Sequence, residues 1–322
     1  MRFYSIVIPV YNRPNEIDEL LESLTHQTFE HFEVIIVEDG STVKCDHLVP
    51  KYDDKLQLKY FFKPNTGQGF SRNFGFEKSE GDYLIVFDSD CIIPKHYLST
   101  VHDFLSKEPL DAFGGPDKAL ASFTPVQRAI SYSMTSFFTT GGIRGGKRRV
   151  GAFHPRSFNM GIRKSVFLKT GGYIITRMGE DIEFSIRIIE KGFNTGLIPG
   201  AYVYHKRRTN LPEFYKQLKF FGRARVNVSR FYPKEIKLVH LFPMTFMLGL
   251  VVTFALTITA FEILASLGAI AYFLFGSVLF IDSWIKSKNL KVAIISVAAA
   301  FTQLIAYGHG FLSEGLKKLI KG

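Results

Sequence analysis

Val86-Phe87-Asp88-Ser89-Asp90 closes an unbroken apolar run that begins at Tyr83. Such a run of strand-forming residues is typical of a β-strand buried on both faces, as in parallel sheets covered by helices. Ligands of open parallel sheets bind beyond the carboxyl ends of the strands. Because side chains two positions apart on an extended segment point the same way, we expect Asp88 and Asp90 to converge at that edge.

Two carboxylates at one sheet edge indicate a site for a hard divalent cation. Asp88 and Asp90 suit Mg²⁺ or Mn²⁺, and a substrate diphosphate would supply further oxygen ligands. The alternative is a solvated turn after the strand, because Asp-rich turns are common. The triplet alone leaves both interpretations open.

Strands and helices alternate along the first part of the chain. Apolar runs at residues 3–10, 32–37 and 58–62 predict strands, and the spacing of apolar residues after Pro14 predicts a helix. A second helix is expected after Gly67-Gln68-Gly69, a segment that otherwise reads as a loop requiring positive φ. This alternation predicts an α/β fold with a mostly parallel sheet and right-handed crossovers.

The predicted strands end in polar clusters. These are Tyr11-Asn12-Arg13 after Pro9, Glu38-Asp39-Gly40-Ser41, and Asp88-Ser89-Asp90. In a parallel sheet such ends lie along one edge, where a nucleotide would bind. The alternative for Asp39-Gly40 is an ordinary turn. The later glycine segment is not a Walker loop, because no Gly-Lys-Ser/Thr follows it.

Further candidates follow in the middle of the chain. Residues 158–162 and 197–204 are strand-like runs. Gly179-Glu180-Asp181 precedes a predicted helix, where acidic residues usually act as caps or dipole partners. His205 follows the second run, and a lone His there is more often structural than a ligand. Residues 141–149, rich in glycine and cations, predict a mobile loop that is either simply solvated or able to close over a bound donor.

The composition points to a membrane. The chain has 322 residues and a formal net charge of +11, with a basic collar at residues 206–237 directly before long apolar segments. Such a collar marks the cytoplasmic side and attracts anionic lipid, so we predict membrane lipids as partners and no nucleic acid. Cys45 and Cys91 lack metal-ligand spacing and fit a reducing cytosol, and the opening strand predicts no signal peptide.

Three apolar segments occupy the last part of the chain. Residues 238–261 and 263–281 are each long enough to cross a bilayer core of ~30 Å at ~1.5 Å per residue. Residues 292–312 are interrupted by polar side chains, and a third span would place the final lysines outside, so we expect this segment to be spanning or interfacial, with the interfacial arrangement favoured. The predicted domains are a catalytic domain over 1–235, including the collar, and a membrane domain over 236–322.

These motifs, in this order, make the chain similar to the inverting glycosyltransferases of family 2, which have the GT-A fold. The resemblance covers about the first 235 residues. It includes the strand-end clusters named above together with Gly67-Gln68-Gly69-Phe70-Ser71-Arg72-Asn73-Phe74-Gly75, Phe158-Asn159-Met160-Gly161-Ile162-Arg163, Gly171-Gly172-Tyr173 and Gly179-Glu180-Asp181. Each motif is weak by itself, and their common order identifies the family.

The resemblance implies a role for each motif. Asp39 would hydrogen-bond the base of a nucleotide-sugar donor, and Asp181 of the Glu180-Asp181 catalytic motif would be the general base. Asp88, Asp90 and His205 would hold a metal ion, Mg²⁺ or Mn²⁺, and the donor diphosphate. The implied donor-binding residues are Pro9, Tyr11, Asn12, Arg13, Glu38, Asp39, Gly67, Arg72, Asp88 and Ser89.

One motif departs from the processive members of the family. They carry Gln-x-x-Arg-Trp after the catalytic Asp, whereas this chain has Gln217-Leu218-Lys219-Phe220-Phe221. We therefore expect a non-processive enzyme that transfers one sugar, from a UDP-sugar, to a lipid-linked or other membrane-held glycan in cell-surface polysaccharide biosynthesis. It would be a multi-pass protein of the cell inner membrane with a cytoplasmic catalytic domain. The alternatives are a polyprenyl-phosphate glycosyltransferase that charges the lipid carrier, and a non-catalytic membrane scaffold that retains the fold.

Overall fold

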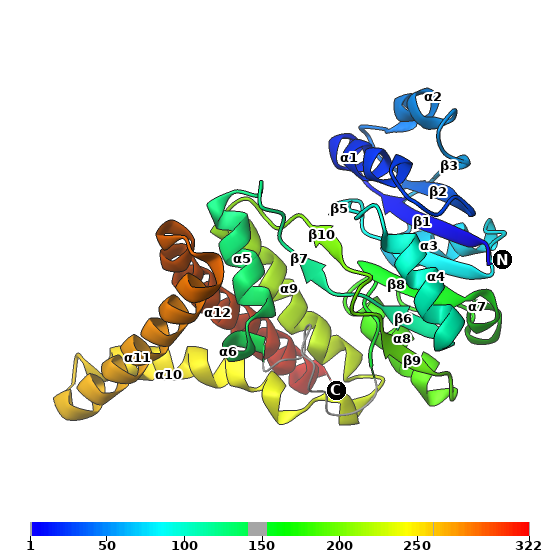
Figure 1. Cartoon of the computed structure of the whole chain (residues 1–322). Coiled ribbons are helices and arrows are strands. Elements are labelled where there is room, and N and C mark those ends of the chain that lie inside the picture. Colours follow the sequence, from blue (N-terminus) through cyan, green and yellow to red (C-terminus); the bar gives the residue numbers. More distant parts are fainter. Residues whose placement is uncertain (1, 141–152, 260, 322) are drawn as a thin grey trace. The chain divides into compact units, whose positions relative to one another are not determined.

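The computed structural model describes residues 2–140, 153–259 and 261–321 in two compact units (Figure 1). The first comprises Met1–Lys118 and Arg149–Lys206, and the second Ala119–Arg148 and Arg207–Gly322. The loop predicted at 141–149 lies outside the described residues. The units divide at Lys206 and not near residue 235, because α9 (Leu211–Val228) packs against α12 (Leu290–Lys321). A catalytic domain that extends to residue 235 stays a prediction.

A seven-stranded sheet forms the centre of the first unit. Its strands lie in the order β3-β2-β1-β4-β8-β6-β9, and β8 runs antiparallel to both of its neighbours while the other pairs are parallel. The predicted α/β fold with a mostly parallel sheet is confirmed. The strands are β1 (Tyr4–Val10), β2 (Phe32–Asp39), β3 (Leu58–Lys63), β4 (Tyr83–Phe87), β6 (Ala112–Gly114), β8 (Asn159–Arg163) and β9 (Thr195–Leu197).

Helices cover both faces of this sheet. Successive residues of a strand point to opposite faces, so Ile6 and Ile8 of β1 pack in one core with α1 and α4, whereas Val7 packs in the other with α3, α7 and α8. The polar ends of β1, β2 and β4 are thereby left at one edge. The helices are α1 (Pro14–Thr25), α2 (Val49–Tyr52), α3 (Gln68–Glu77), α4 (Tyr97–Lys107), α7 (Lys164–Thr170) and α8 (Glu180–Glu190).

A small second sheet lies in the same unit. Its strands are β5 (Cys91–Ile92), β10 (Val203–His205) and β7 (Asp117–Lys118), with β10 antiparallel to β5 and parallel to β7. The prediction of one strand over 197–204 is therefore wrong. The apolar run is interrupted by Pro199-Gly200, so its two ends join different sheets.

The second unit is helical. Its helices are α5 (Pro125–Thr135), α6 (Phe137–Thr140), α9, α10 (Phe242–Leu256), α11 (Glu262–Ser287) and α12, and α12 contacts α5, α9, α10 and α11. Apolar side chains such as Ile130 of α5, Phe214 of α9 and Ala306 of α12 form its core. Backbones approach closely where α9 crosses α12, at Gly222 and Gly310.

Among the residues that the structure describes, two helices, α11 and α12, have the length and apolar composition to cross a membrane. The buried share of the apolar window is 11% in α11 and 44% in α12. Within the predicted span 238–261, α10 has 15 residues and a length of about 22 Å, which is shorter than predicted, and a crossing by this segment stays a prediction. Its turns stop at Leu256, where Thr257 and Thr259 bond back to the carbonyls of Phe254 and Leu256.

We predict that Gly222→Ala destabilises the second unit. A Cβ atom at Gly222 would lie 2.1 Å from the carbonyl oxygen of Tyr307. Overpacking of this kind costs about 1–3 kcal/mol, which exceeds the ~0.5–1 kcal/mol that Ala gains over Gly in a helix. Thermal unfolding of the detergent-purified chain measures the change. The matched control is Gly315→Ala on α12, where no atom lies within 4 Å and stability should be equal or slightly higher. Equal midpoints for the two variants would contradict the close crossing.

Candidate functional site

Asp90 is held by two basic side chains at the edge of the sheet. Arg13 Nη1 donates to Asp90 Oδ2 over 2.9 Å, and His205 Nε2 lies 3.0 Å from Asp90 Oδ1. Burial alone would raise the pKa of Asp90, but His205 and Arg13 hold it far below its usual range. Asp90 is therefore a fixed carboxylate anion at neutral pH.

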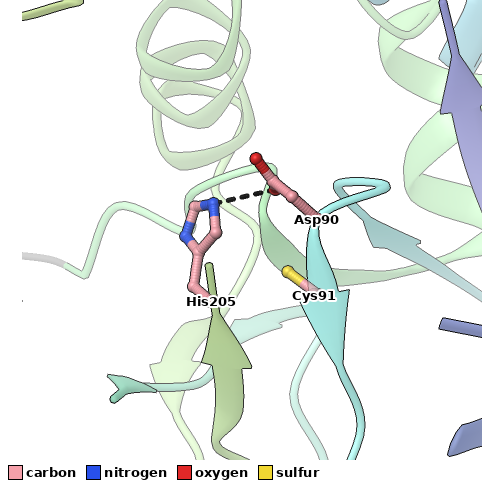
Figure 2. A group of neighbouring side chains, drawn as sticks. All are labelled: Asp90, Cys91 and His205. Atoms are coloured by element: carbon pink, nitrogen blue, oxygen red, sulfur yellow. Dashed lines mark ion pairs between the residues drawn. The ribbon is translucent and has the colours of Figure 1, made fainter. Parts of the chain in front are cut away.

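Asp90, Cys91 and His205 form a group that fits a metal ion (Figure 2). One donor atom of each lies within 4.8 Å of the others. A carboxylate oxygen and an imidazole nitrogen are ligands that Mn²⁺ accepts. The structure thus brings together two of the three predicted metal ligands, Asp90 and His205. The third, Asp88, turns to another partner.

That partner is Arg72, which bridges two of the predicted motifs. Arg72 Nη2 donates to Asp88 Oδ1 over 2.9 Å and Arg72 Nη1 to Glu180 Oε1 over 3.2 Å. The guanidinium lies 5.4 Å from the centre of the Tyr173 ring, and the residue is 1% exposed. Gln68 donates a second hydrogen bond to Glu180. A buried cation on α3 therefore joins the metal motif to the Glu-Asp motif.

Asp181 lies at the start of α8 and is bound by Arg156. Arg156 Nε donates to Asp181 Oδ2 over 2.7 Å, and the backbone N–H of Ile182 donates to Oδ1 over 2.9 Å. Burial by itself would raise the pKa of Asp181. The charges of Arg156 and Arg72 lower this pKa by more than burial raises it, so the net shift is downward. Burial and the neighbouring Asp181 raise the pKa of Glu180. The pKa values of the two adjacent carboxyl groups are therefore shifted in opposite directions.

Asp39 ends β2 and accepts three hydrogen bonds. Lys63 Nζ and the backbone N–H of Thr66 bond to Oδ1, and the N–H of Gly67 bonds to Oδ2 over 2.8 Å. Burial raises the pKa of Asp39, but Lys63 and Thr66 lower it more, so the net shift is downward. Gly67 has a φ of +90°, which favours glycine. Gly69 lies inside α3 and has no positive φ.

The other predicted donor residues lie in different surroundings. Tyr11 is half exposed beyond β1, and Asn12 Oδ1 accepts from the backbone of Thr42 and Val43, which ties the first two strand ends together. Pro9 lies within β1, and Ser89 is buried between the two aspartates. Glu38 does not join the group, because its Oε2 accepts from Cys45 and from the hydroxyl of Tyr60 in the core. The role of Glu38 in donor binding stays a prediction without support from its contacts.

Three basic or polar partners were not identified from the sequence. Lys63 ends β3 and could have been found by the same strand-end argument that found Asp39. Gln68 lies inside a quoted motif, but nothing in the motif pairs it with Glu180. Arg156 precedes β8 by a few residues and offers no signal, because its pairing with Asp181 depends on the turn of the chain between them.

The sequence of residues 5–171 matches the family model of glycosyl transferase family 2. Similar curated proteins include an uncharacterized glycosyltransferase of Rickettsia bellii, 43% identical over 86 residues. The poly(ribitol-phosphate) beta-N-acetylglucosaminyltransferase TarS of Staphylococcus aureus is 36% identical over 115 residues, and the probable glycosyltransferase YdaM of Bacillus subtilis is 25% identical over 232. The matches cover 27%, 34% and 68% of this chain and 12%, 20% and 54% of these relatives, so the chain spans only part of their length.

Solved structures resemble the chain in fold. The mannosyltransferase PcManGT from Pyrobaculum calidifontis, in complex with GDP-Man and Mn²⁺, has a TM-score of 0.66 and 14% identity over 93% of this chain and 87% of its own. TarS 1–349 of S. aureus in complex with UDP-GlcNAc has a TM-score of 0.52 and 20% identity over 98% and 92%. At these identities the likeness concerns the fold, which is that of the GT-A type.

We predict that Arg72→Met strongly destabilises the protein. Met keeps much of the side-chain volume but leaves Glu180 and Asp88 without their common cation, and breaking a buried ion pair from one side costs about 3–5 kcal/mol. Thermal unfolding of the full chain tests this. Arg177→Met is the control, because Arg177 is exposed and a surface change should stay within about 0.5 kcal/mol. A small effect at Arg72 would mean that the bridge is not a structural requirement.

The stability of the protein should depend on Asp39 in a pH-dependent way. The folded pKa of Asp39 is below its ordinary value of 3.8, so its contribution is complete above that value and is lost as the pH falls through the folded pKa. Asp39→Asn should therefore be less stable than the wild type at neutral pH, and the difference should shrink below about pH 4. Unfolding midpoints across pH measure it, with the exposed Asp54→Asn as control. A difference independent of pH would refute the assignment.

Proposed function

Because this chain belongs to glycosyl transferase family 2, we propose that it transfers a sugar from a nucleotide-sugar to a membrane-associated glycan acceptor. The proposal depends mainly on one observation. Arg72 binds both Asp88 and Glu180, so the residues proposed to hold the donor and the acceptor adjoin one buried cation. The similar protein TarS is by name a transferase that adds N-acetylglucosamine to a polymer, which agrees with this class of reaction.

We propose that the donor lies along the edge formed by β1, β2 and β4. Asp39, anionic and anchored by Lys63, would accept a hydrogen bond from the nucleobase, and the half-exposed Tyr11 would pack on it. Arg13 offers a cation to the diphosphate beside Asp90. UDP is the proposed nucleotide, on the family resemblance described above.

Asp90 and His205, with Asp88 nearby in the chain, would hold the proposed Mg²⁺ or Mn²⁺. When bound, such a cation neutralises the charge that develops on the leaving diphosphate. The fixed negative charge of Asp90 and the adjacent imidazole are the observations that support this use. Ser89 is proposed to keep the two aspartates in register.

Asp181 is the proposed general base. It would take the proton of the acceptor hydroxyl while the hydroxyl oxygen bonds to the anomeric carbon and the bond from that carbon to the diphosphate breaks, a single displacement that inverts configuration. The pairing with Arg156 keeps Asp181 ionised and able to accept a proton at neutral pH. Glu180, held by Arg72 and Gln68, would position Asp181 at the first turn of α8.

The acceptor is proposed to be a lipid-linked glycan. Two helices able to cross a membrane, α11 and α12, and the basic collar support attachment to the cytoplasmic face of the cell inner membrane. Attachment would raise the effective concentration of a membrane-held acceptor. The Gln217-Leu218-Lys219-Phe220-Phe221 sequence supports one transfer per encounter, without processive polymerisation.

We predict that Asp181→Asn lowers sugar transfer by about 100- to 10,000-fold, the range for loss of a general base. Nucleotide binding should persist, because Asp181 does not contact the proposed base site. Transfer is measured with UDP-, GDP- and dTDP-sugars, with and without Mn²⁺, and binding by thermal stabilisation, which reaches ~2.7 kcal/mol at a hundred times the Kd. Glu190→Gln, exposed at the other end of α8, is the matched control.

The outcomes separate the alternatives. Retained transfer in Asp181→Asn would remove Asp181 as the base. Transfer to plain polyprenyl phosphate, and not to a lipid-linked glycan, would favour an enzyme that charges the lipid carrier. A folded wild-type protein that binds no nucleotide would favour a non-catalytic scaffold.

A further inference from the structure

Cys91 and His205 face each other across two paired strands. β5 and β10 are antiparallel, and their register places His205 directly opposite Cys91. Residues opposite each other in such a pair share one face of the sheet, with Cβ atoms about 4.5–5.5 Å apart. Figure 2 shows the sulfur of Cys91 and the carboxylate of Asp90 on the same side of the imidazole. The thiol thus belongs to the same donor group as the carboxylate and the imidazole.

Phe158 fixes the orientation of both side chains. Its ring stacks on the imidazole of His205, with centroids 5.3 Å apart and planes 25° apart. Its carbonyl oxygen accepts a hydrogen bond from Cys91 Sγ over 3.6 Å. The ring contact can hold the imidazole as a metal ligand, whereas the hydrogen bond belongs to the thiol and is given up when the sulfur loses its proton and binds a metal ion as thiolate. Cys91 is 1% exposed, so a metal ion at its sulfur would be shielded from solvent on that side.

A thiolate changes which metals a site prefers. Mg²⁺ binds oxygen ligands almost exclusively, whereas Zn²⁺ binds Cys, His and carboxylate together. Three protein ligands with a fourth open position are the usual arrangement of a reactive zinc site. Asp90, Cys91 and His205 supply one ligand of each chemical type.

We propose that Asp90, Cys91 and His205 bind Zn²⁺, or a divalent transition metal of similar affinity for sulfur, in preference to Mg²⁺. The open coordination position would be left for an oxygen of the donor, and in this respect the inference rests on the proposed function. Binding of the metal itself needs neither nucleotide nor acceptor. The metal requirement of the site would then differ from the all-oxygen preference that Asp88 and Asp90 alone suggest.

The experiment uses the full chain, purified in detergent without a polyhistidine tag and loaded with Zn²⁺ alone. X-ray absorption at the zinc edge should show one sulfur neighbour at ~2.3 Å together with nitrogen or oxygen neighbours at ~2.0–2.2 Å. Titration with Cd²⁺ should produce a thiolate charge-transfer band with a stoichiometry of one. Neither measurement requires a variant, so misfolding of a mutant cannot obscure the result.

The second buried cysteine provides the matched control. Cys45 Sγ donates to Glu38 in the core, so Cys45→Ala should keep the sulfur neighbour and the Cd²⁺ band. Cys91→Ser should lose both and bind Zn²⁺ at least about 100-fold more weakly, since even outer partners of a metal site change affinity about 10- to 100-fold.

Zinc without a sulfur neighbour in the wild type, or a Cd²⁺ band that survives in Cys91→Ser, would overturn the proposal. Because no nucleotide is present, these results are independent of the transfer assays. Sulfur-bound zinc in a protein that transfers no sugar would leave the metal site standing while the proposed function fails.

Discussion

The arrangement of the first unit depends on the buried guanidinium of Arg72. Its two ion pairs join Asp88, at the end of β4, to Glu180, at the start of α8. Arg72 and Glu180 lie 108 residues apart in the sequence. A guanidinium without solvent must keep both partners, because an uncompensated buried charge is strongly unfavourable. Its position in turn depends on α3, which can lie close to β1 because Gly75 has no Cβ atom; one would meet Val7 at 2.3 Å. Backbone contact and charge pairing therefore hold the segments that carry Asp88 and Glu180 together.

The other cations of the site differ from Arg72 in their freedom to change partners. The side chains of Arg13 and Arg156 are 29% and 28% exposed, whereas that of Arg72 is 2% exposed. A partly exposed arginine can leave a carboxylate for a phosphate, since water screens the group it leaves and phosphate offers the same bidentate geometry. A bound diphosphate could thus draw Arg13 from Asp90, and an anionic acceptor could draw Arg156 from Asp181. Both exchanges would free a carboxylate oxygen at the moment when a ligand arrives.

The sequence predicts the elements that have periodic apolar patterns and misses those that do not. The strands β1, β2, β3, β4 and β8 and the helices α1, α3 and α8 are predicted within a few residues of their observed bounds. The strands β5 and β7 have two residues each, too few to show any alternation. The sequence also shows no sign that Cys91 lies with Asp90 and His205, because only the pairing of β5 with β10 brings Cys91 opposite His205. Motif order located Asp39, Asp90 and Asp181. The position of Lys63 at the end of β3 could have placed it beside Asp39, but no pattern specified Arg156 as the partner of Asp181, since ion pairs between distant segments leave no local signal.

Side-chain partners also explain the polar residues that interrupt the apolar run of the last helix. His309 within this segment and Glu314 just after it are both satisfied within the protein: His309 Nδ1 lies 2.7 Å from the hydroxyl of Tyr215, and Glu314 pairs with Arg223 and Arg230. His309 and Glu314 of α12 face α9, and Ser296 accepts a hydrogen bond from Ser283 of α11, so these polar residues report the packing of helices and not exposure to water. The most apolar part of α11 is only 11% buried within the protein, whereas that of α12 is 44% buried. Exposed apolar surface of this extent suits lipid or the apolar surface of another protein, so α11 is the helix of the two whose apolar side chains mostly lack partners within the described part of the second unit, and α12 is the helix on which the rest of that unit packs.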